Sequence, residues 1–167
     1  MKRKLGSSRK ITEIAVFASL YAVLTWVLAP ISYQMFQFRI SESLKSLVVL
    51  RRHLIVAFVI GNALSNIFSP FVGVWELVWM PFMNLLGGTS AWVIGRVLKN
   101  RKLLSMMIGG FVYALWIAFG VSLLLNQLFG LPLTLTFIYI LIPETICICG
   151  FSPVMLKIHE RIKEKWG

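Results

Sequence analysis

The sequence predicts an all-α integral membrane protein with six transmembrane helices in one bundle and both termini in the cytoplasm. Composition is the first observation behind this prediction. Of the 167 residues, 58% are hydrophobic and only 14% are charged, which is too little charge for a soluble domain of this size. The second observation is the placement of the basic residues. All but Arg39 and Lys45 of the 17 lysines and arginines fall in four clusters, at 2–10, 51–52, 96–102 and 157–165.

The four basic clusters predict the topology. Lys and Arg beside apolar spans mark the cytoplasmic face, because they are hard to translocate and favour anionic lipid. If every cluster is cytoplasmic, the chain crosses the membrane and returns between each cluster and the next. Four clusters have three such intervals, which makes three hairpins and six spans. The net charge of +11 then reflects topology, and no nucleic acid is needed to explain it. We expect residues 1–167 to form a single transmembrane domain in the cytoplasmic membrane of a prokaryotic cell.

The first three predicted helices cover about 11–29, 41–50 and 53–68. The first has too long an apolar region for a signal peptide, and Pro30 ends it. The second begins near Ser41, a favourable N-cap with Glu42 in its first turn. Because crossing about 30 Å of hydrocarbon takes about 20 helical residues, we expect this helix to be tilted or preceded by a membrane-buried loop. The third ends before Pro70.

The last three predicted helices cover about 75–98, 103–127 and 133–158. Pro81 lies inside the fourth, so we expect a kink near its outer third. Pro143 and Pro153 interrupt the sixth. Cys147 and Cys149 are two residues apart on that helix and point about 200° away from each other, so we expect neither a disulfide nor a shared metal. No other pattern suggests a metal or a cofactor.

Three carboxylates, those of Glu42, Glu76 and Glu144, fall in the outer half of the predicted membrane region. Ionisable groups within spans are costly and usually face a polar cavity. Amides, aromatic rings and the cation of Arg39 lie at similar depth, and this mixture is typical of a small-molecule site open to the outside. The candidate binding residues are Gln37, Arg39, Glu42, Asn66, Glu76, Trp79, Asn84, Trp116 and Glu144.

A purely structural role could also explain several of these candidate residues. Arg39 and Glu42 could pair with each other, and Glu76 could act as an electrostatic cap at a helix N-terminus. Trp116, together with Trp75 and Tyr139, could belong to an interfacial aromatic belt. Glu144, next to Pro143 and deep in the last helix, is the hardest to explain without a function.

Catalytic constellations are missing from the sequence, so no catalytic residue is predicted. Both histidines, His53 and His159, are predicted at the cytoplasmic surface, far from any outer nucleophile. The chain has no zinc-protease motif, nucleophile elbow or phosphate-binding loop. It can therefore bind a solute, but it shows no means of hydrolysing ATP.

Small residues recur at helical spacing on two predicted helices. The first helix carries Ala15, Ala18 and Ala22, and the fourth carries Gly87, Ala91 and Gly95. Such stripes allow two helix backbones to approach closely in lipid. Each stripe could serve packing within the bundle or contact with a partner subunit.

Three segments carry a resemblance to a known family. Leu-Ala-Pro-Ile-Ser at 28–32, Gln-Phe-Arg-Ile-Ser-Glu at 37–42 and Asn-Ile-Phe-Ser-Pro at 66–70 resemble the QueT family. These proteins are the substrate-binding S components of energy-coupling factor (ECF) transporters, assigned to queuosine precursors. The similarity extends over most of the chain in length, span count and charge pattern. It departs at 74–76, where a small residue and Asp are typical, and at 43 and 45, where apolar residues are typical.

The resemblance implies a binding subunit that captures a solute outside the cell. It implies docking on a membrane T component that carries two cytoplasmic ATPases, with Ala18 and Ala22 matching the family's A-x-x-x-A docking stripe. It also places Asn84, Trp116 and Glu144 on the helices that line S-component pockets.

A 7-deazaguanine suits the candidate site. Its N1–H and 2-amino group can share one carboxylate, its carbonyl can accept from Asn, Gln or Arg, and its ring can stack on Trp or Tyr. Thiamine or another flat cationic heterocycle also fits. The alternative from another class is a small membrane enzyme, or an enzyme subunit, acting on a lipid or isoprenoid. A purely structural membrane subunit is a third possibility, against which the buried Arg39 and Glu144 argue.

Overall fold

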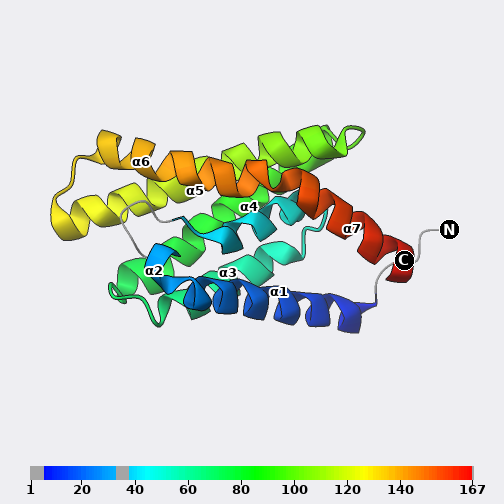
Figure 1. The fold of residues 1–167 in the computed structure, drawn as a ribbon, viewed down its shortest axis with the longest axis horizontal. Helices are drawn as coiled ribbons and strands as arrows, with labels where there is room; N and C mark the ends of the chain where they lie inside the picture. The colour runs from blue at the N-terminus through cyan, green and yellow to red at the C-terminus, as the bar shows by residue number, and fades with distance from the viewer. Residues whose placement is uncertain (1–5, 33–37, 167) are drawn as a thin grey trace.

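The fold is known from a computed structural model, which describes residues 6–32 and 38–166. All regular secondary structure in these two ranges is helical (Figure 1), which confirms the predicted all-α class. The elements are α1 (Ser7–Val27), α2 (Ala29–Ser32), η1 (Ile40–Val49), α3 (Leu54–Asn66), η2 (Trp75–Trp79), α4 (Met80–Val97), α5 (Lys102–Phe129), α6 (Leu133–Thr145), η3 (Ile146–Gly150) and α7 (Ser152–Trp166).

Four helical stretches are long and apolar enough to cross a membrane. They are α1, η2 with α4, α5, and the run from α6 through η3 into α7. The helix α3 is apolar but has only 13 residues, and η1 has 10. Large apolar side chains such as those of Val56, Ile60 and Val93 point outward, as expected where lipid covers the surface. The protein is therefore a multi-pass membrane protein, while the count of six crossings stays a prediction.

The second predicted helix differs in kind from the expectation, because η1 is a 3₁₀ helix rather than an α-helix. Ten residues are long for this conformation, and at about 2.0 Å per residue they extend about 20 Å. Arg39, not Ser41, is the N-cap, and it makes no side-chain capping bond. The hydroxyl of Ser41 instead lies 2.8 Å from Thr25 Oγ1 of α1. It therefore ties η1 to the neighbouring helix.

The helix η1 runs through the middle of the bundle, where Figure 1 draws it in cyan. Every residue from Ser41 to Val49 is buried, because α1, α3, α4, α5, η3 and α7 all pack against this element. Two glycines permit the close approach. A Cβ at Gly95 of α4 would collide with the carbonyl oxygen of Val49, and a Cβ at Gly109 of α5 would come within 2.8 Å of Val49 Cγ2. The stripe formed by Gly87, Ala91 and Gly95 thus serves internal packing.

Prolines shape three of the helical runs. Pro30 does not end the first helix: α1 stops at Val27, and Pro30 lies within the short α2, where a first-turn proline is tolerated. Ahead of Pro81, the π-helix η2 lets the Met80 N–H donate to the Trp75 carbonyl, five residues back. The π-helix η3 lies between Pro143 and Pro153 in the last run. The wider turns of η2 and η3 occur beside prolines, which remove a backbone donor from the α-helical pattern.

Described residues from the four basic clusters lie at one end of the bundle, where Figure 1 shows α1 begin and α7 end. Glu13 of α1 pairs with Arg9 at 3.6 Å and with Arg51 at 2.9 Å. Arg51 also donates to His159 Nδ1 of α7 at 3.0 Å, and Lys102 pairs with Glu160 at 3.0 Å (α5 to α7). The described members of the clusters therefore share one end of the bundle, while the assignment of this end to the cytoplasm stays a prediction.

Candidate functional site

A group of charged side chains is buried where η1 begins. Arg39, Glu42 and Lys45 are 5%, 1% and 0% exposed. Glu42 and Lys45, one 3₁₀ turn apart, form an ion pair, and the hydroxyl of Tyr21 on α1 donates to Glu42 Oε1. Arg39 Nε donates to the carbonyl oxygen of Ser32 at 3.1 Å. Charges in the core of a membrane protein are expensive, so this cluster is the main candidate for a site.

Two tyrosine rings enclose the ammonium of Lys45. Its Nζ lies 5.3 Å from the centroid of Tyr21 and 5.1 Å from that of Tyr113, within the range of cation–π attraction. The Tyr113 hydroxyl donates to Asn84 Oδ1 at 3.1 Å, and Asn84 Nδ2 donates to the Met80 carbonyl at 2.9 Å. A continuous polar network therefore connects α1, η1, α5 and α4.

Glu144 completes the cluster from α6. It is 2% exposed and lies close enough to Glu42, Lys45 and Arg39 to interact with their charges. Its Oε2 atom has no hydrogen-bond partner within residues 6–32 and 38–166. A buried carboxylate oxygen without a donor is unfavourable unless something else supplies one. Glu144 therefore offers an acceptor inside the bundle.

A second group of polar side chains surrounds Glu76 of η2. Asn66 Nδ2 donates to the Glu76 carbonyl oxygen at 3.0 Å, and the Glu76 carboxylate interacts with Ser69 and with the charge of Arg39. Glu76 is 4% exposed, and its Oε2 also has no hydrogen-bond partner in the described part of the chain. Arg39 therefore connects this group electrostatically to the cluster around Glu42.

A comparison with protein-family models identifies the family of this chain. The model of the QueT transporter family matches residues 11–161, most of the chain. The chain belongs to the QueT transporter family. A search of curated proteins and a search of solved structures gave no match. This QueT chain is a membrane transport component, and its buried charges belong to a protein that carries a small molecule.

Two predicted site residues of the QueT chain use their polar groups elsewhere. Trp79 Nε1 donates to the Gly120 carbonyl at 3.1 Å, and Trp116 Nε1 donates to Ser90 Oγ at 3.2 Å. Both bonds join α4 or η2 to α5, so these indoles hold helices together. Gln37 lies outside the described residues. A ligand-binding role for each of these three residues stays a prediction.

The sequence did not identify three members of the cluster as binding residues: Tyr21, Lys45 and Tyr113. Tyrosines in apolar helices are usually core residues, so neither ring stood out. Lys45 did carry a signal, because it is a lysine three residues after Glu42 in a membrane-embedded segment. Its burial depends on the packing around η1, which a single sequence does not contain.

The three alanines of the predicted docking stripe on α1 differ in exposure, and their docking role stays a prediction. Ala18 and Ala22 are 4% and 2% exposed, because they pack inside the QueT chain, where Gly61 of α3 approaches the Ala18 carbonyl. A partner cannot reach their side chains in this conformation. Ala15, by contrast, is exposed. It lines a shallow hollow on the outer face of α1 with Val16, Ser19, Leu20 and Val23.

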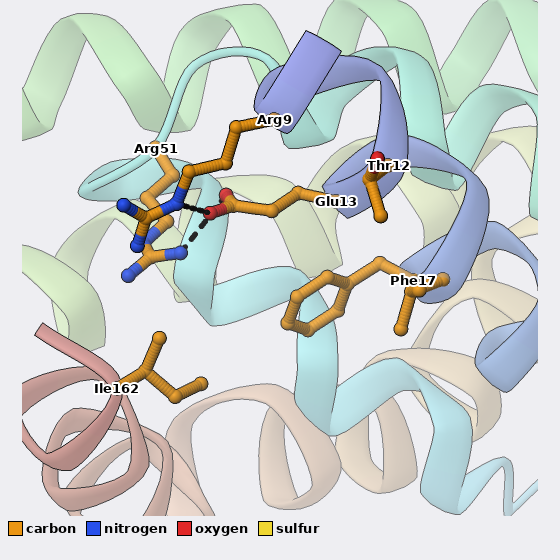
Figure 2. A pocket seen from close by; sticks show the side chains of 7 residues that line it. Arg9, Thr12, Glu13, Phe17, Arg51 and Ile162 are labelled. Atoms are coloured by element: carbon orange, nitrogen blue, oxygen red, sulfur yellow. Dashed lines mark hydrogen bonds and ion pairs between the residues drawn. The ribbon is translucent and has the colours of Figure 1, made fainter. Parts of the chain in front are cut away.

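A larger hollow of about 690 Å³ lies at the end of the bundle that carries the termini (Figure 2). It is lined by Arg9, Thr12, Glu13, Val16, Phe17, Arg51 and Ile162. Figure 2 shows the Arg9 and Arg51 side chains both reaching the Glu13 carboxylate, with Phe17 and Ile162 below them in the view. Because these charges already pair with one another, the hollow offers less to a polar ligand than the buried cluster does.

Proposed function

We propose that this QueT chain is the substrate-binding S component of an ECF-type transporter that takes up a queuosine precursor of the 7-deazaguanine class. It would capture the solute from outside the cell and deliver it to a membrane T component. Two cytoplasmic ATPases would supply the energy, consistent with the absence of any ATP-binding motif in the sequence.

The observation that carries this proposal is the buried Glu144 carboxylate, whose Oε2 atom has no hydrogen-bond partner among the described residues. A protein that only packs helices gains nothing from such a group. A 7-deazaguanine brings two parallel donors, its N1–H and 2-amino group, and Glu144 could accept both. The guanidinium of Arg39 or the amide of Asn84 could donate to the ligand's carbonyl oxygen.

Titration of the purified chain with 7-deazaguanines tests the proposal. Glu144→Gln keeps the shape of the side chain but removes its charge. Losing a charge-assisted hydrogen bond costs about 1.5–3 kcal/mol, so we expect the Kd to rise about ten- to a hundredfold or more. Glu160→Gln is the matched control, because Glu160 is exposed at the other end of the bundle and its loss should leave the Kd unchanged.

Two outcomes would contradict the proposal. Failure of the wild-type chain to bind any 7-deazaguanine would remove the ligand class, and thiamine in the same titration series shows whether another flat heterocycle takes its place. An unchanged Kd in Glu144→Gln, with wild-type binding intact, would remove Glu144 from the site.

The exposed face of α1 is the surface on which we expect the T component to dock. Ala15 and Ser19 are small, four residues apart and exposed, so they permit a close helix approach. Ala15→Trp or Ser19→Trp should preserve ligand binding by the isolated chain but reduce ATP-dependent uptake by the assembled transporter. Val93→Trp is the control, on an exposed position of α4. Normal uptake by both α1 variants would exclude this face.

A further inference from the structure

The ammonium of Lys45 lies at the position in the cluster where a cationic group of a ligand would bind best. Its side chain is fully buried, its ammonium is paired with Glu42, and the Tyr21 and Tyr113 rings lie on either side of it at 5.3 and 5.1 Å. Two aromatic faces and a carboxylate are the groups with which proteins bind the ammonium of a ligand. Here the chain itself supplies that ammonium.

We propose that Lys45 is a specificity-determining residue, which occupies the cation position of the site and so selects a heterocycle with an uncharged substituent. For the 7-deazaguanine class this means a neutral group at C7 rather than an aminomethyl group. The inference rests on the proposed function, and it specifies which member of the ligand class this chain binds.

The balance of charge around Lys45 supports this selection. The charged groups that act on its ammonium are Glu42, Glu144 and Arg39. Two carboxylates and one further cation therefore surround the Lys45 ammonium. A further ammonium entering here would meet Lys45 and Arg39 at close range, and like charges brought together in a buried site repel strongly. The Glu76 carboxylate interacts with the charge of Arg39.

The packing of η1 keeps the ammonium in place. Leu44, Lys45 and Ser46 are all buried. At the end of η1, Gly95 of α4 and Gly109 of α5 allow their helices to approach Val49 closely. Lys45 is fully buried, and moving it out of the cluster would break its ion pair with Glu42. A cationic ligand therefore cannot easily displace the Lys45 ammonium and take its position.

Paired titrations test the proposal directly. The probes are 7-cyano-7-deazaguanine, which is neutral, and 7-aminomethyl-7-deazaguanine, which is a cation at neutral pH and similar in size. We expect wild type to bind the cyano compound at least about tenfold more tightly, the size of effect that one charge-assisted contact gives. Lys45→Met removes the charge with little change in length, and it should shift the ratio of the two Kd values towards the aminomethyl compound by about ten- to a hundredfold.

The control variant is Lys45→Arg, which keeps the charge and should keep the preference for the neutral probe. Tighter binding of the aminomethyl compound by wild type would overturn the proposal even if no variant folds. An unchanged ratio in a folded Lys45→Met variant would overturn it as well. Both of those results leave the proposed function standing, whereas failure of wild type to bind either probe refutes the proposed function itself.

Discussion

At the scale of single residues, the buried charges of Arg39, Glu42 and Lys45 each have a partner within the cluster. Glu42 receives the Tyr21 hydroxyl and the Lys45 ammonium, and Arg39 donates to the Ser32 carbonyl. Removing one partner of a buried charge leaves that charge uncompensated, which costs more than the bond itself contributed. Tyr21 therefore supports the Glu42 carboxylate through its hydroxyl and faces Lys45 with its ring.

Two tyrosine variants separate these contributions. Tyr21→Phe removes a donor from a charged acceptor and should lower the free energy of unfolding by about 1.5–3 kcal/mol, whereas Tyr113→Phe removes a neutral bond to Asn84 and should cost about 0.5–1.5 kcal/mol. Thermal unfolding in detergent gives the ranking. Equal losses, or a larger loss for Tyr113→Phe, would mean that the hydroxyl of Tyr21 does not stabilise Glu42.

Residue-level prediction from the sequence worked where a side chain is rare in its setting. Arg39, Glu42 and Glu144 were singled out because charges seldom occur within apolar spans, and the structure brings these three together. The partners were harder to find. A tyrosine in α1 and another in α5 are 92 positions apart in the numbering, and only the packed bundle brings both rings to Lys45.

At the scale of elements, η1 shows what sequence patterns could and could not give. Its position and shortness followed from the length of the apolar stretch, and its bounds are close to the predicted 41–50. Its 3₁₀ geometry did not follow, because local propensity does not favour ten residues in that conformation. Contacts with six neighbouring elements hold it in that geometry, and glycines on those neighbours make the contacts possible.

Gly95 provides a test of that close packing. Alanine at this position would place a Cβ against the carbonyl oxygen of Val49, and backbone atoms cannot move aside as a flexible side chain can. We expect Gly95→Ala to lower the free energy of unfolding by about 1–3 kcal/mol, the usual cost of overpacking. Gly150→Ala is the matched control in η3, where a Cβ meets nothing within 4 Å. Equal stability of the two variants would contradict the tight approach of α4 to η1.

At the scale of the whole molecule, ion pairs and hydrogen bonds connect basic residues from different clusters at one end of the bundle. Besides Arg9, Glu13 pairs with Arg51 at 2.9 Å and with His53 at 2.7 Å, two residues that directly precede α3. Arg51 extends the network to His159 of α7. One carboxylate therefore holds together the N-terminal helix, the turn before α3 and the C-terminal helix.

The two glutamates of this end should differ in importance. Glu13 and Arg51 are 14% and 13% exposed, so Glu13→Gln leaves half-buried cations without a counter-charge and should lower the free energy of unfolding by about 1–3 kcal/mol. The Glu160 side chain is 46% exposed, and Glu160→Gln should change stability little, because exposed ion pairs contribute little. High salt should reduce the difference between the variants. A larger effect of Glu160→Gln would mean that the exposed pair, not Glu13, secures this end.

The orientation of the molecule in the membrane decides how a solute reaches the buried cluster. Figure 1 places the α4–α5 turn at the end of the bundle with both termini and the α5–α6 turn at the opposite end. Basic residues at the terminal end predict that this end is cytoplasmic. Gly73, Asn100 and Pro132 are all exposed, which makes them suitable positions for a reporter cysteine.

A cysteine at position 73 or 132 should therefore react with a membrane-impermeant thiol reagent applied to intact cells, and a cysteine at position 100 should react only after the cells are opened. The parent chain is the control for its own thiols, because Cys147 is buried and Cys149 is half-buried. Labelling in the reverse pattern would place the basic end outside, against the direction in which positive charge is retained. It would also mean that a solute approaching from outside first meets the paired charges around Glu13 rather than the side of the bundle where Arg39 and Glu76 lie. Capture from outside, on which the proposed function depends, would then be refuted by the same experiment.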